Sequence, residues 1–72
     1  MFKHANEETI REETRHLCRQ FCVISKRRNK TILVNFIISE LESLYGSEVE
    51  NLFHEEWLDE VAVFCNEYQM EE

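Results

Sequence analysis

Apolar residues recur every three or four positions in the first third of the chain, a spacing that places them on one stripe of an α-helix. The stripe consists of Ile10, Thr14, Leu17, Phe21 and Ile24. Asn6 is well suited to cap the N-terminus, because its side chain can accept a bond from a free backbone amide. The pattern predicts a helix over residues 7–27, with the cations of residues 26–28 at its C-terminal end, where they suit the helix dipole.

A second helix is predicted over residues 31–45, with apolar side chains around almost its whole circumference. Its first residues also fit a buried strand, but a lone strand has no partner in this chain. Gly46 is a natural helix stop, because glycine readily takes positive φ. A helix that is apolar on nearly all sides is expected to be enclosed by neighbours.

The apolar stripe changes phase in the last third of the chain. The apolar side chains of residues 49–53 point one way, and those of residues 57–68 are centred roughly 120° away at about 100° per residue. A straight helix cannot direct both groups at one core, so we expect a break near residues 54–56. Ser47 and Glu50 have the spacing of a capping box, which marks the start of this region.

Together the patterns predict an all-α protein, a small three- to four-helix bundle that forms a single helical domain over residues 1–72. The helices are expected at about residues 7–27, 31–45, 47–53 and 55–69. One glycine and no proline among 72 residues agree with helices joined by short turns. A domain this short is marginally stable alone and usually needs a staple, a partner or a second copy.

Charge is divided sharply along the sequence. All eight Lys and Arg residues lie between Lys3 and Lys30, whereas eleven of the fifteen carboxylates follow residue 30. The first thirty residues carry +4 and the remainder −11, which gives the net charge of −7. Fold stability does not require such a separation, and a split this sharp predicts a molecule with a positive end and a negative end, which affects the partners it meets.

The acidic residues of the last predicted helix form the first candidate site. Carboxylates are expected on its outer face, opposite the apolar stripe, and they surround one exposed apolar residue. The candidate partner-binding residues are Glu55, Glu56, Asp59, Glu60, Val63 and Glu67. Such a face suits a protein partner with a basic, partly apolar surface. We therefore expect a non-enzymatic interaction module that inhibits or redirects its partner. In composition the chain resembles accessory proteins of phages and other mobile elements.

The basic residues of the first helix and the following turn form an alternative site. Arg11, Arg15 and Arg19 recur every four residues and share one flank of the helix. A nucleic-acid-binding regulator would contact phosphates through Arg15, Arg19, Lys26, Arg27, Arg28 and Lys30. The net negative charge and ordinary intrahelical pairs, such as Glu7 with Arg11, weigh against this alternative.

The cysteines and histidines suggest a metal site, but their spacing does not support one. Cys18 and Cys22 lie one turn apart, whereas His16 projects to the opposite side of the same helix. A zinc site would then need Cys65 and a further ligand from elsewhere in the fold. We therefore expect no metal and no cofactor, and no enzymatic activity, since no Gly-rich loop or nucleophile–base pair is apparent. The odd number of cysteines and the lack of a membrane span or secretory signal suggest a reducing cytoplasmic compartment.

The second predicted helix also bears on oligomeric state. Two other helices of one small chain cover two of its sides, which leaves the side with Ile32 and Phe36 in water. We therefore expect a homodimer or a chain stabilised by its partner. The rival interpretation is a monomer in which the last two helices wrap around the second.

Overall fold

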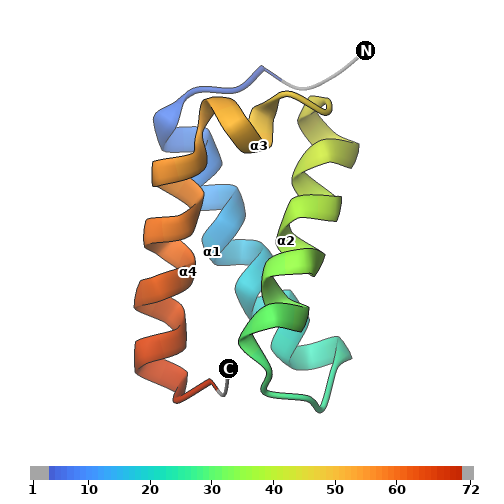
Figure 1. The fold of residues 1–72 in the computed structure, drawn as a ribbon, viewed down its shortest axis with the longest axis vertical. Helices are drawn as coiled ribbons and strands as arrows, with labels where there is room; N and C mark the ends of the chain where they lie inside the picture. Colours follow the sequence, from blue (N-terminus) through green and yellow to red (C-terminus); the bar gives the residue numbers. More distant parts are fainter. Residues whose placement is uncertain (1–3, 71–72) are drawn as a thin grey trace.

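The structure is a computed structural model, and it describes residues 4–70. Its regular structure consists of α1 (Glu7–Ile24), α2 (Lys30–Tyr45), α3 (Val49–Leu52) and α4 (His54–Tyr68). Figure 1 shows α1 and α4 running in the same direction, α2 returning antiparallel to them, and the short α3 crossing one end. Both α2 and α4 pack on α1, and α3 connects α2 with α4. The predicted all-α bundle is thus confirmed.

The start of α1 agrees with the sequence pattern. The Asn6 side chain accepts a hydrogen bond from the Thr9 amide at 2.9 Å, and the Thr9 hydroxyl accepts one from the Asn6 amide at 2.9 Å. These reciprocal bonds satisfy two backbone donors that a helix N-terminus otherwise leaves free. The predicted cap is therefore confirmed.

The end of α1 differs from the prediction, because the helix stops at Ile24 instead of residue 27. Ser25 has extended backbone angles, and its hydroxyl accepts a bond from the Arg27 amide at 3.2 Å. The Arg28 guanidinium donates to the Ser25 carbonyl at 3.1 Å. The cations of residues 26–28 therefore lie in a loop and do not complete the last turn of α1. Ile24 is 64% exposed and lies outside the core in which it was expected.

Gly46 ends α2 as predicted, with φ 102° and ψ 162°. The expected capping box of Ser47 and Glu50 does not form. Instead α3 begins at Val49, and Glu48 occupies its cap position in a helical conformation without a side-chain bond. The reason is the tight turn after Gly46, whose carbonyl accepts the Val49 amide at 3.3 Å and thereby replaces a side-chain cap.

The predicted break between the last two helices is confirmed, and it falls on Phe53, one residue before the expected range. Phe53 has φ −118° and ψ 32°, which interrupts the helical path. The Trp57 indole nitrogen spans the break by donating to the Glu50 carbonyl at 2.8 Å. The break allows the apolar groups on either side of it to reach one core, as the change of phase required.

The core draws on all four helices. Its buried apolar residues are Ile10, Leu17, Cys18, Phe21, Leu33, Ile37, Leu41, Val49, Trp57, Val61 and Phe64. Ile32 and Phe36 are half-buried against this core, and the rings of Phe21 and Phe36 have centroids 5.6 Å apart. This side of α2 is therefore partly covered by the chain's own core and not left in water as expected, and the homodimer that was inferred from it stays a prediction. Of the helices within residues 4–70, none is long and apolar enough to cross a bilayer.

Candidate docking groove between the first and last helices

The two sets of charged residues singled out in the sequence face each other across α1 and α4. Arg11, Arg15 and Arg19 line one flank of α1 because they recur every four residues. On α4, Glu60 lies three residues after the buried Trp57 and four before the buried Phe64. That spacing places Glu60 beside the buried stripe and not opposite it, so the carboxylate points toward α1.

Ion pairs join these two flanks. Arg11 Nη1 lies 2.9 Å from Asp59 Oδ2 and 3.0 Å from Glu60 Oε2, and Arg15 Nε lies 3.5 Å from Glu60 Oε1. The hydrogen bonds to Asp59 and then to Glu60 raise the pKa of Arg11 above its ordinary value. Only 14% of the Glu60 side chain is exposed. The expectation that Glu60 belongs to a solvated outer face is therefore wrong, since its charge is used within the fold.

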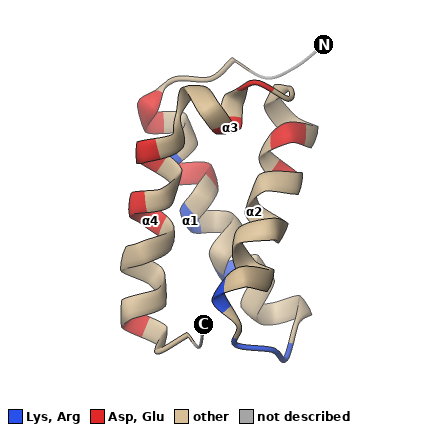
Figure 2. Ribbon diagram, viewed as in Figure 1, with Lys and Arg blue, Asp and Glu red and all other residues tan. Residues whose placement is uncertain are grey.

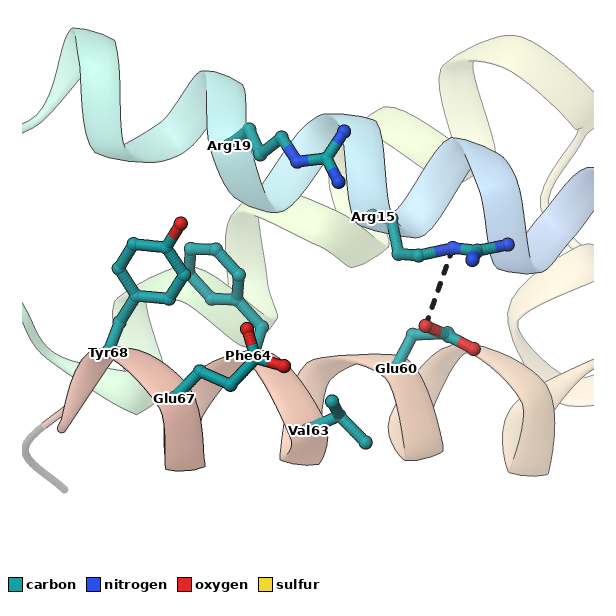
Figure 3. Close-up of a pocket in the computed structure, with 7 residues that line it drawn as sticks. All are labelled: Arg15, Arg19, Glu60, Val63, Phe64, Glu67 and Tyr68. Carbon is teal, nitrogen blue, oxygen red and sulfur yellow. Dashed lines mark ion pairs between the residues drawn. The ribbon is translucent and has the colours of Figure 1, made fainter.

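A groove of about 120 Å³ opens beside these pairs (Figure 3). Two of its lining residues, Arg15 and Arg19, belong to α1. The others belong to α4 and are Glu60, Val63, Phe64, Glu67 and Tyr68. The rings of Phe64 and Tyr68 stack with centroids 4.2 Å apart and form its aromatic part. The groove thus brings together members of both candidate sites, which the sequence treated as rivals.

The charges of the groove are only partly neutralised. Glu60 and Arg15 pair at one end of it (Figure 3). Within residues 4–70, neither Arg19 nor Glu67 has an ion pair or a side-chain hydrogen bond, and both are exposed. The groove therefore offers an anion on one wall, a cation on the other and aromatic surface between them.

The remaining acidic candidates lie on the exposed part of α4. Glu55 and Asp59 are exposed, Glu56 is half-buried, and Val63 is 50% exposed. Asp59 and Glu67 lie one turn before and one turn after Val63 on the same side of the helix. Five of the six predicted residues thus retain an accessible side chain, namely Val63 and four carboxylates on the same helix.

The basic candidates do not form the single ridge that was expected. Arg15 and Arg19 lie in the groove, whereas Lys26, Arg27 and Arg28 lie in the loop after α1. Lys30 begins α2. Arg28 is engaged in holding its own loop, and Arg15 is engaged with Glu60. The loop therefore forms a second, separate basic region.

Cys22 and Cys65 lie close enough to Cys18 to affect the pKa of its thiol, and Cys18 is fully buried. Burial raises the pKa of the Cys18 thiol to about 12, with smaller contributions from Cys65 and Cys22. Burial also raises the pKa of Cys65. Among residues 4–70, no three His, Cys, Asp or Glu side chains are arranged to hold a metal ion. His16 lies beside Thr9 and Tyr45 in a different depression, as its place on the helix predicted.

Charges are separated along the long axis of the molecule, in agreement with the positive and negative ends that the charge split in the sequence predicted (Figure 2). Carboxylates gather where α1 and α4 begin and α3 crosses, and cations occupy the loop at the opposite end. Residues 14–39 contain six cations and no carboxylate.

Helix dipoles account for only part of this polarity. Carboxylates in the first turns of α1 and α4 suit the positive end of each dipole. The antiparallel α2 has the reverse arrangement, with Lys30 at its start and Glu42 in its last turn. A charge of unsuitable sign at a helix end is unfavourable by about 0.3–1 kcal/mol. The polarity therefore exceeds what helix stability requires.

Exposed apolar residues accompany both ends, and the sequence analysis did not identify them as functional. Leu52 is 71% exposed at the acidic end, and Val23 is 85% exposed at the basic end. Val23 could have been found from its place on the helical wheel, opposite the buried stripe. Leu52 could not, because its exposure results from the turn around α3.

Comparisons of the chain with models of protein families, with curated proteins and with solved structures find no match.

Proposed function

We propose that this chain is a non-enzymatic interaction module that uses its acidic last helix to bind a partner protein with a basic, partly apolar surface, and that it inhibits or redirects this partner. The docking surface consists of the exposed α4 residues Glu55, Glu56, Asp59, Val63 and Glu67, together with the adjoining groove. An accessory role in a phage or other mobile element, within a reducing compartment, suits the small acidic chain with its three free cysteines.

The observation that carries this proposal is the environment of Val63. It is half-exposed, has a carboxylate one turn away on each side, and lies at the edge of a groove lined by Phe64 and Tyr68. An apolar contact with carboxylates on both sides along the helix combines burial with electrostatic selection of the partner. The alternative, that this helix face only contacts water, does not account for the adjoining groove.

The groove also indicates which partner side chains fit. A lysine or arginine of the partner can pair with Glu67, which has no ion pair within residues 4–70, while its aliphatic part contacts Val63. The half-exposed ring of Tyr68 adds a face for a cation. Arg19 on the opposite wall selects against a partner segment that is purely basic, and favours one carrying a carboxylate nearby.

A nucleic-acid-binding regulator has less support from the arrangement. Its predicted residues are divided between the groove and the loop, and Arg15 is already paired with Glu60. Carboxylates on α4 flank the cations of the groove, so a phosphate backbone approaching Arg19 also meets Glu67.

Paired charge reversals test the proposal. The partner is captured on immobilised protein from the cell that encodes it, identified by mass spectrometry, and then titrated with purified variants. Glu55→Lys with Glu67→Lys should weaken binding by at least about tenfold, because both carboxylates are exposed and belong to the docking surface.

The matched control is Glu40→Lys with Glu42→Lys on α2, which changes the net charge equally on a helix away from the docking surface. Its affinity should stay within about twofold of the wild type. Equal weakening by both pairs would show that net charge, and not the docking surface, determines the affinity. An unchanged affinity of the Glu55 and Glu67 pair would refute the α4 docking surface.

A further inference from the structure

The end of α1 presents two aliphatic side chains to water directly beside the basic loop. Val23 is 85% exposed and Ile24 is 64% exposed. Lys26 and Arg27 follow them, and both side chains are exposed without an ion pair within residues 4–70. These two aliphatic and two cationic side chains are thus adjacent in sequence and all exposed, and they are here called the basic end.

The backbone of this loop is held in place from within. The Ser25 hydroxyl accepts the Arg27 amide at 3.2 Å, and the Arg28 guanidinium donates to the Ser25 carbonyl at 3.1 Å. At the next residue, the Asn29 side chain caps α2 by accepting the Ile32 amide at 3.1 Å. The side chains of Lys26 and Arg27 are thus presented by an ordered turn, which lowers the entropic cost of using them in a contact.

The opposite end of the molecule has complementary chemistry. Leu52 is 71% exposed on α3, with the exposed Glu48 before it and the exposed Glu55 after it. Glu50, on the same short helix, adds a further carboxylate. This surface is here called the acidic end. The only lysine or arginine of α2, α3 and α4 is Lys30, and it lies at the other end of α2.

We propose that the basic end docks on the acidic end of a second copy of this chain. Two copies lying antiparallel form this contact twice, because the two ends lie at opposite ends of the long axis (Figure 2). Each contact joins Val23 and Ile24 with Leu52 and surrounds them with charges of opposite sign. The closed pair has the two-fold symmetry that is commonest among oligomers.

A second copy satisfies this surface better than a nucleic acid does. Phosphates would pair with Lys26 and Arg27 but would leave both aliphatic side chains in water. The pairing differs from the homodimer expected from α2, because it uses the ends of the molecule and not the side of α2 that carries Ile32 and Phe36. It shares Glu55 with the α4 docking surface, but its test substitutes residues outside that surface and uses the purified chain without the partner protein.

Sedimentation equilibrium of the purified chain tests the contact. A dimer mass is expected at about 0.1 M salt, where charges act over about 10 Å, and at least roughly tenfold weaker association at about 1 M salt, where they act over about 3 Å. Lys26→Glu with Arg27→Glu should abolish association, and so should Glu48→Lys with Glu50→Lys. Circular dichroism confirms that both variants fold, since the substituted side chains have few contacts to lose.

Mixing the two variants provides the decisive measurement. Each variant alone removes the charge complementarity between its own two ends, whereas one copy of each restores pairs of opposite charge at the substituted positions. The mixture should therefore form a one-to-one heterodimer. A chain that is monomeric at every salt concentration, a mixture that stays monomeric, or open-ended growth instead of a dimer would each overturn the antiparallel pair. Monomeric protein that binds duplex DNA through Lys26 and Arg27 would assign the basic end to nucleic acid instead.

Discussion

Thr14 is a polar residue at a buried position of the kind that apolar side chains usually occupy. It is fully buried in the stripe of α1, and its hydroxyl donates to the Ile10 carbonyl at 2.7 Å. A buried hydroxyl without a partner would cost free energy, but this bond within the helix satisfies it. The sequence placed Thr14 on the apolar stripe by spacing alone, and the structure supplies the bond that makes the position acceptable.

Cys18 leads to a prediction at the same scale. Its thiol has a pKa of about 12 in the folded chain because it is buried, against 9.0 for an exposed thiol. Above about pH 9 the unfolded chain loses this proton while the folded chain retains it, so stability is complete below that pH and falls as the pH rises toward 12. The slope approaches about 1.4 kcal/mol per pH unit for one fully affected group.

Urea unfolding at several pH values between about 8 and 11 measures this dependence. The pKa values of Tyr45 and Cys65 are raised as well, mainly by burial, and they add to the fall. Cys18→Ala should therefore show a shallower decline with pH without abolishing it. An identical slope in the variant would mean that the thiol is accessible in the folded chain.

At the scale of elements, the contact between α1 and α4 depends on charge as well as on apolar packing. Arg11 bridges Asp59 and Glu60, and Arg15 also reaches Glu60, from sequence positions more than forty residues away. Periodicity identified the flank of each helix, but the pairing of the two flanks follows from the way the chain returns through α2 and α3. The acidic and basic candidates are consequently neighbours.

Glu60→Lys should lower the melting temperature by about 5 °C, because it places a third cation against Arg11 and Arg15 in a largely enclosed position. Glu67→Lys is the matched control, since the same reversal occurs two turns later at an exposed carboxylate. The control should change the melting temperature by no more than about 2 °C. Thermal circular dichroism of both variants decides the matter, and equal shifts would show that Glu60 is solvated like its neighbours.

The junction between α2 and α3 depends on Gly46. Its angles, φ 102° and ψ 162°, are accessible to glycine at little cost and to other residues only with strain. Gly46→Ala should therefore reduce the free energy of unfolding by about 1–3 kcal/mol. Ser47→Ala, at the exposed next position, should change it by less than about 0.5 kcal/mol in the same urea titration. A tolerated alanine at position 46 would mean that the turn adopts another conformation.

For the whole molecule, the directions of the helices convert the separation of charge along the sequence into a separation of charge in space. Because α1 and α4 start at one end and α2 ends there, most of the carboxylates gather toward that end, with Glu67 near the end of α4 as an exception. The loop between α1 and α2 leaves its cations at the other. Both proposals use this geometry: α4 presents a carboxylate surface to a basic partner, and the two ends complement each other in a second copy.

The sequence by itself determined the helices, because local periodicity, an N-cap and a helix-ending glycine act within a few residues. Asn6, Gly46 and the change of phase before Trp57 each indicated a feature that the structure contains. It also determined that opposite charges would be separated along the chain. These features need no knowledge of which helix packs against which.

Only the tertiary structure decided which charges remain available. The position of Glu60 was compatible with a solvated face until α1 brought Arg11 and Arg15 against it, since an ion pair between distant residues leaves no local pattern. The same holds for Phe36, which α1 covers, and for Leu52, which the turn around α3 exposes. Burial depends on neighbours supplied by the whole fold, and for this reason the spacing of residues along one helix could not predict it.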